Sequence, residues 1–286
     1  MRIADEVSEI IPTGPNNPNC DTMTLTRDLY AIRRAQPRDR FEIFAIKTAA
    51  FGENYLLYTI FQTPLAATYL EQLITTQAEE KGDQIFVVDQ RGAILGYYHA
   101  VERETDFFLN YIAVAGIARS SGLGQALLMH FETTGQTCGY RQLGLDVFES
   151  NQWVSSWYQR HGYALQSVSF HVRLKIGTLQ GEGNLWQCEQ KAWAEAIEEE
   201  KTRGFSKVDC NWGQGRLTLG LIATRICKLL RYDGISLDEA VSAIMCRFNQ
   251  EREILILSSL PDIPLNWPLL SVERVLTLRK VVDCKI

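Results

Sequence analysis

The segment Asn110–Met129, NYIAVAGIARSSGLGQALLM, carries the strongest fold signal in the sequence. It opens with a β-rich run and a glycine-containing turn, and the residues that follow the turn recur at helical spacing: Leu123, Ala126, Leu127, His130, Phe131 and Thr134. The pattern predicts a strand, a turn and an amphipathic helix. Because the N–H groups at a helix start are unpaired and carry partial positive charge, such a turn is suited to hold a phosphate.

The turn itself runs from Arg119 to Gly124 and reads RSSGLG. Its glycines would let the backbone approach a phosphate closely, and Arg119 adds a cation. A glycine-containing turn is also a common packing solution, so the turn alone does not establish a site. The GxGxxG fingerprint is absent and the preceding strands read as an antiparallel meander, which argues against a dinucleotide-binding fold.

A second pattern begins at Asn151, after the β-rich run RQLGLDVF at residues 141–148. The residues that define it are Val154, Trp157, Tyr158, Arg160, Gly162 and Tyr163. The spacing predicts a strand end with Asn151 near an N-cap, followed by a short helix that ends at Gly162.

The two segments together resemble the GCN5-related N-acetyltransferase (GNAT) family. The family's first motif, Arg/Gln-x-x-Gly-x-Gly/Ala after the fourth strand, matches Arg119, Gly122 and Gly124. Its second motif matches Asn151, Tyr158, Arg160, Gly162 and Tyr163. The order of elements expected over residues 31–176 also fits. The resemblance covers about half of the chain and implies a mixed α/β fold with a mostly antiparallel central sheet.

The resemblance also implies that acetyl-CoA, or another acyl-CoA, binds between strands four and five as a co-substrate, without a metal. The family holds the pantetheine on the backbone of strand four, here Ile112, Ala113 and Val114. The pyrophosphate then rests on the turn and helix start, here Arg119, Ser120, Ser121, Gly122, Leu123, Gly124 and Gln125. Asn151 is expected to hydrogen-bond the pantetheine arm, and Tyr158 to protonate the departing thiolate.

The general base is not assigned by the resemblance. The glutamate that some members carry on strand four has no counterpart, since Phe107–Leu109 occupy that region, and Gly116 replaces a proline common after this strand. Glu149, near the end of strand five, is our candidate base. The alternatives are Glu102, Glu104, His99 and a water chain. Tyr158 could also be a core aromatic, and Trp153 and Trp157 are interpreted as packing residues.

Beyond residue 176 the sequence predicts a second α/β pattern. We expect helices over 192–203, 217–232 and 237–248, the last capped by Ser236 and Glu239, and strands over 205–212, 254–257 and 271–282. The turn Gly213-Gln214-Gly215 is expected to cap the helix over 217–232. We predict an N-terminal arm at 1–29, an acetyltransferase domain at 30–176 and a C-terminal α+β domain at 177–286. For the C-terminal domain three roles remain open: a degenerate second acetyltransferase-like half, a lid that shapes the acceptor site, or a dimerisation element.

Composition narrows the class of protein. The 286 residues carry 29 Lys and Arg against 34 Asp and Glu, a net charge of −5, which argues against non-specific nucleic-acid binding. The seven cysteines are odd in number and show no CxxC spacing, which is typical of reduced thiols in a cytoplasmic protein. No apolar stretch reaches the roughly 18 residues of a membrane span, so we expect no membrane partner.

Two functions remain open from the sequence. The first is an N-acetyltransferase in which a primary amine of a small molecule or peptide attacks the thioester directly. The second is a CoA-binding scaffold, weak or inactive in catalysis, that acts through its C-terminal domain. The final β-rich run could pair with a sheet edge, so a homodimer is a further alternative.

Overall fold

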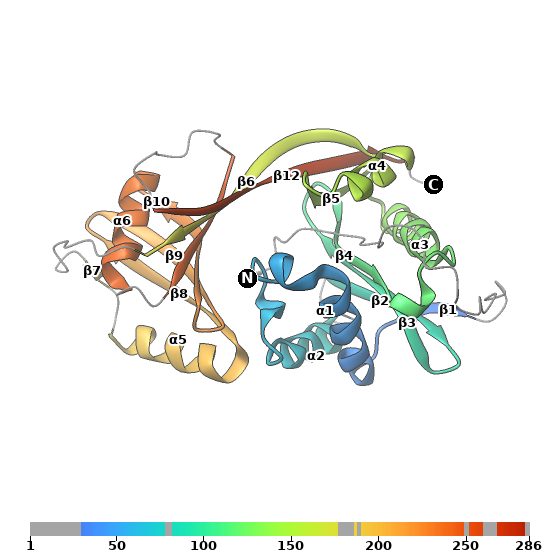
Figure 1. The fold of residues 1–286 in the computed structure, drawn as a ribbon, viewed down its shortest axis with the longest axis horizontal. Helices are drawn as coiled ribbons and strands as arrows, with labels where there is room; N and C mark the ends of the chain where they lie inside the picture. The colour runs from blue at the N-terminus through green and yellow to red at the C-terminus, as the bar shows by residue number, and fades with distance from the viewer. Residues whose placement is uncertain are drawn as a thin grey trace. The chain divides into compact units, whose positions relative to one another are not determined.

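A computed structural model describes residues 30–77, 82–176, 186–187, 190–248, 252–259 and 268–283. The predicted arm at 1–29 and the predicted boundary segment at 177–184 lie outside the described residues. The chain divides into two compact units (Figure 1). The N-terminal unit comprises residues 30–56, Ala67–Ser167 and 276–283, and the C-terminal unit comprises Leu57–Ala66 and Val168–Val275. Within these ranges, no helix is long and apolar enough to cross a membrane.

The N-terminal unit contains the elements that the first half of the sequence predicts. Its helices are α1 (Arg40–Leu56), α2 (Ala66–Thr76), α3 (Leu123–Thr137) and α4 (Gln152–Arg160). Its strands are β1 (Ala31–Arg34), β2 (Asp83–Gln90), β3 (Ala93–Glu102), β4 (Phe107–Val114) and β5 (Gln142–Phe148). The strands β6 (Ala164–Lys175) and β12 (Leu269–Val281) each contribute residues to both units.

Strands β1 to β4 form an antiparallel meander that two helices cover from opposite faces. Neighbouring residues of β3 point to opposite faces of the sheet. Tyr98 packs against Phe131 of α3, and His99 stacks on Tyr111, whose ring also meets Phe51 of α1. The core of the unit is therefore a sheet held between α1 and α3 (Figure 1).

Strands β4 and β5 run parallel but pair over only three residues. The last pair joins Leu109 to Leu145, although β4 continues to Val114 and β5 to Phe148. The β4 strand also carries a bulge, because the pairing with β3 steps from Leu109–Ala100 to Tyr111–His99. The two strands therefore part at Asn110, and the expected opening between strands four and five is present.

The C-terminal unit repeats part of the order found in the N-terminal unit: an antiparallel meander, a helix, and a strand that pairs in parallel with the last strand of the meander. Strands β8 (Phe205–Trp212), β9 (Gly215–Ile222) and β10 (Ile226–Asp233) form an antiparallel meander, and β11 (Glu253–Ser258) pairs in parallel with β10. Helix α5 (Gln190–Arg203) precedes the meander, and α6 (Leu237–Arg247) lies between β10 and β11. The apolar core lies between the sheet and both helices, with members such as Ala196, Val208, Leu219, Ile244 and Ile254.

The predicted helix over residues 217–232 is wrong. This stretch forms β9 and β10, which pair from Ile222–Ile226 outward. Every residue of β9 except Arg216 is buried, so the strand lacks the apolar–polar alternation that marks a half-exposed strand. The turn uses Ala223 and Thr224, both at positive φ, where glycine or asparagine is usual. The Gly213–Gly215 turn therefore joins two strands and caps no helix.

The mixed fold class is confirmed in both units. In each, one strand pair is parallel (β4–β5 and β10–β11) and the others with a described register are antiparallel. The sheet is thus mixed but mostly antiparallel, as the sequence predicts.

Candidate functional site

The loop that joins β4 to α3 leaves the start of the helix open. Gly122 is the N-cap of α3 and has φ 84°, and Ser120 also has a positive φ of 62°. No side chain of a described residue caps the helix; the Ser121 hydroxyl instead donates to the Ala118 carbonyl at 2.6 Å. The first N–H groups of α3 therefore remain available to an anion.

A cavity of about 240 Å³ brings the two sequence motifs together. One side is the β4–α3 segment, and the other is α4, which contributes Trp153 and Trp157. The lining residues from the first side are Val114, Ala118, Arg119, Ser120, Gly122, Leu123, Gly124 and Gln125. The loop is the polar end of the cavity and the two indoles are its apolar wall.

The loop residues fit a diphosphate group. Arg119 supplies a guanidinium whose enclosed Nε has no hydrogen-bond partner among the described residues. A side chain at Gly124 would meet only the Val114 Cγ2, at 3.9 Å, so packing within the protein does not demand glycine there. A ligand that approaches the backbone amides would demand it, as P-loop and dinucleotide sites do.

The residues expected to hold the pantetheine lie on the open side of β4. Ile112, Ala113 and Val114 pair with β3, but β5 no longer pairs with them. Their backbone groups on the β5 side face the opening between the strands, and an extended ligand can hydrogen-bond to such an edge as an added strand does.

The remaining predicted residues lie around α4. Asn151 is the N-cap of α4, and its Oδ1 accepts a hydrogen bond from the Val154 N–H at 3.3 Å. Tyr158 is fully buried, with ring contacts to Trp157 and Tyr163 at 5.0 and 5.6 Å. Glu149 follows the end of β5 and is half-buried. Asn151, Tyr158 and Glu149 do not line the cavity.

Two of the alternative bases, His99 and Glu102, have protein partners. His99 is buried, and its Nε2 lies 2.8 Å from the Asp83 carboxylate. Glu102 accepts hydrogen bonds from Gln84 and from the Tyr140 hydroxyl, the latter at 3.2 Å. Both groups therefore link β3 to the neighbouring strand β2. Glu104 lies exposed beyond the end of β3.

Two contributors to the cavity were missed by the sequence analysis. Trp153 and Trp157, interpreted there as packing residues, are four residues apart and therefore share one face of α4. Trp153 is 50% exposed, which is unusual for a residue whose role is to fill a core. Their spacing was a usable signal, but only the fold shows that this face of α4 meets the loop.

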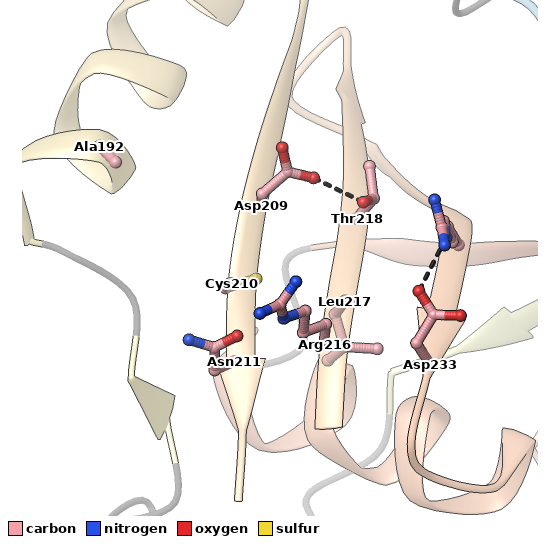
Figure 2. Close-up of a pocket in the computed structure, with 9 residues that line it drawn as sticks. Ala192, Asp209, Cys210, Asn211, Arg216, Leu217, Thr218 and Asp233 are labelled. Atoms are coloured by element: carbon pink, nitrogen blue, oxygen red, sulfur yellow. Dashed lines mark hydrogen bonds and ion pairs between the residues drawn. The ribbon is translucent and has the colours of Figure 1, made fainter. Parts of the chain in front are cut away.

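The C-terminal unit has a larger cavity, of about 580 Å³, with a polar lining (Figure 2). Asp209 accepts a hydrogen bond from Thr218 at 2.5 Å, and Asp233 pairs with Arg231 at 2.8 Å. Both carboxylates of this polar cavity already have protein partners, and no predicted site residue lines it, so the cavity at α3 is the stronger candidate. Among the described residues, no group of His, Cys, Asp and Glu could hold a metal ion.

Comparisons with known proteins point to the same part of the chain. The sequence model of the acetyltransferase (GNAT) family matches residues 54–163, which include both motifs. No curated protein sequence matches the chain.

Solved structures with acetyltransferase folds resemble the chain over most of its length. A tandem GNAT protein from the clavulanic acid biosynthesis pathway is 9% identical, with a TM-score of 0.63 over 90% of this chain and 100% of that one. A GCN5-related N-acetyltransferase from Sphaerobacter thermophilus is 14% identical, with a TM-score of 0.57 over 91% and 98%. One from Kribbella flavida is 10% identical, with a TM-score of 0.55 over 89% and 71%. At these identities the likeness shows the fold.

Proposed function

We propose that this chain transfers an acetyl group from acetyl-CoA to a primary amine, because residues 54–163 match the sequence model of the acetyltransferase (GNAT) family. The observation that carries the proposal is the uncapped start of α3 beside Arg119, which opens into the cavity walled by Trp153 and Trp157. The acceptor is proposed to be a small molecule or peptide with a free amine.

The loop and strand residues act by positioning the two substrates. The amides at 122–125 and Arg119 hold the diphosphate, and residues 112–114 of β4 hold the pantetheine arm along the opening. The amine nitrogen forms the new C–N bond and the C–S bond breaks. The amine loses one proton and the departing sulfur gains one, so that the products are an N-acetylated amine and CoA.

The proton transfers are assigned to residues near α4. We propose Tyr158 as the acid that protonates the sulfur and Glu149, through water, as the base that takes the proton from the amine. Tyr158 is fully buried, and its ring contacts with Trp157 and Tyr163 hold it within an aromatic cluster. A deprotonated amine and a neutral tyrosine are the forms that this step requires.

We also propose that the C-terminal unit is a degenerate second acetyltransferase-like half. It repeats the meander, helix and parallel strand of the N-terminal unit, and the likeness to the tandem protein extends over 90% of the chain. The four cysteines that the structure describes as free, Cys138, Cys210, Cys227 and Cys246, support a cytoplasmic location.

Calorimetric titration with acetyl-CoA tests the proposal. We expect saturable binding near one site per chain, reduced at least 100-fold by Gly122→Glu, which places a carboxylate at the open helix start. Gly213→Glu is the matched control, because Gly213 also has a positive φ and no atom within 4 Å of an added Cβ, but lies in the β8–β9 turn.

Release of CoA thiol in the presence of an amine panel then tests turnover. The panel contains spermidine, an aminoglycoside and peptides with free N-termini or lysines. Binding without release for any amine would favour the scaffold function over the enzyme. Absence of binding by the unaltered chain would exclude both.

A further inference from the structure

Asn110 is a fully buried polar residue whose side chain has no partner within the described chain. Its exposed fraction is 0%, and neither Oδ1 nor Nδ2 forms a hydrogen bond with a residue that the structure describes. A buried carboxamide without partners is costly, and an apolar residue of similar size would avoid that cost. We therefore expect the partner of Asn110 to come from outside the chain.

The position of Asn110 coincides with the opening of the sheet. The β4–β5 pairing ends one residue earlier, at Leu109. Asn110 is also the residue that the β4 bulge leaves without a pairing partner on β3, between Leu109 and Tyr111. Bulges redirect the side chains around them and are over-represented next to active sites.

The proposed path of the co-substrate leads to this residue. With the diphosphate at residues 119–125, the pantetheine arm extends back along β4 past Val114 and Ile112. Asn110 lies two residues further along the same strand, where a thioester at the end of the arm would be held. A carboxamide at this place can donate a hydrogen bond to the thioester carbonyl.

We propose that Asn110 is a catalytic residue whose Nδ2–H donates a hydrogen bond to the carbonyl oxygen of the acyl thioester. The inference rests on the proposed function. As the amine forms the C–N bond, the carbonyl electrons move onto this oxygen, and they return when the C–S bond breaks and sulfur leaves with the bonding pair. A fixed donor in a buried site stabilises that charge more strongly than it stabilises the neutral thioester.

The C-terminal unit provides a matched position without the carboxamide. There the β10–β11 pairing ends at Leu229 and Ile256, and the bulge residue that follows is Leu230. The same backbone arrangement is therefore compatible with an apolar residue. The asparagine at 110 is not required by the bulge, which leaves its polar group to be explained by a ligand.

The test compares the affinities of acetyl-CoA and S-ethyl-CoA, a thioether with the same pantetheine arm but without the thioester carbonyl. For the full unaltered chain we expect acetyl-CoA to bind about 5- to 10-fold more tightly. Asn110→Leu should bring this ratio close to one without changing the affinity for S-ethyl-CoA. Asn110→Asp should lower the ratio below one, because a carboxylate repels the carbonyl oxygen. Leu230→Asn is the control and should leave the ratio unchanged.

Vibrational spectroscopy of the bound thioester gives a second test. Its signal would not change if Asn110 had only a structural role. The carbonyl stretch of ¹³C-acetyl-CoA should shift to lower frequency on binding to the unaltered chain, and this shift should shrink in Asn110→Leu. Retention of the affinity ratio or of the frequency shift in Asn110→Leu would overturn the role of Asn110 and leave the proposed function standing. Failure of the unaltered chain to bind either compound would overturn both.

Discussion

The two units use the same order of elements but present opposite charge at equivalent helix starts. In the N-terminal unit, residues 119–125 read RSSGLGQ and carry one positive charge. The equivalent residues 233–239 before and within α6 read DGISLDE and carry three negative charges, from Asp233, Asp238 and Glu239. Both helices begin with leucine, so the difference lies in the loop and in the next two positions.

The two helix starts are also satisfied in different ways. Ser236 accepts a hydrogen bond from the Glu239 N–H, and the Glu239 carboxylate accepts one from the Ser236 N–H at 2.7 Å, a complete capping box. Gly122 provides no side-chain cap at the start of α3. A helix start that is closed and acidic stabilises its own unit, whereas one that is open and basic is suited to hold an anion.

The buried histidines extend the comparison. His99 of the N-terminal unit contacts the Asp83 carboxylate, whereas His171 of the C-terminal unit lies near Lys228. Burial, with a smaller contribution from Lys228, lowers the pKa of His171 to about 3. A histidine with a depressed pKa must stay neutral in the folded protein while the unfolded chain takes up a proton.

The largest expected effect is therefore acid destabilisation through His171. Its contribution is fully present above pH 6.5 and is lost as the pH falls from 6.5 towards 3, by about 5 kcal/mol in total. Urea unfolding at a series of pH values should show the loss, and His171→Phe should flatten the dependence over this window. An equal slope in the two proteins would show that His171 does not carry the linkage.

The next effect comes from giving α3 the acidic first turn of α6. The double variant Gly124→Asp/Gln125→Glu should weaken acetyl-CoA binding about 100-fold, because two carboxylates then face the diphosphate. The same acids favour the helix dipole, so the melting temperature should stay the same or rise. Opposite signs for binding and stability distinguish lost ligand contacts from a damaged fold.

The control for this double variant is Gly124→Asn, which adds a side chain of nearly the same size without charge. It should weaken binding less than the acidic pair does, and the difference measures the electrostatic part. Equal losses in the two proteins would assign the effect to blocked access rather than to charge.

These comparisons depend on features that the sequence reveals unequally. The turn RSSGLGQ, the Ser236 capping box and the strands of the first meander were predictable because each is encoded by local residue types and spacing. The β9–β10 hairpin was not, because nearly all of β9 is buried and its turn at Ala223-Thr224 lacks glycine.

The site was predictable only in its local parts. Asn110 opens the segment that predicts the strand and helix, but its residue type and spacing give it no role of its own. Its importance depends on where β4 parts from β5, a strand over thirty residues away in the chain. The same holds for Trp153 and Trp157, whose position against the loop is set by the packing of α4. Contacts between distant parts of the chain, rather than residue type, place Asn110 and the two tryptophans at the site.

The smallest expected effect tests the closed helix start of the C-terminal unit. Ser236→Ala removes one cap and should destabilise the protein by about 1 kcal/mol, while acetyl-CoA binding should not change. Ser236→Thr keeps the hydroxyl and should restore most of the stability.

The same capping box makes the stability depend on pH. The hydrogen bonds from the Ser236 backbone and hydroxyl lower the pKa of Glu239. Their contribution to stability is therefore present above the ordinary carboxyl pKa and is lost as the pH falls through the lowered value. Ser236→Ala should therefore show a weaker acid dependence than Ser236→Thr in urea unfolding. A loss of acetyl-CoA affinity in Ser236→Ala would contradict the assignment of ligand binding to the α3 start alone, because the two helix starts would then not be independent.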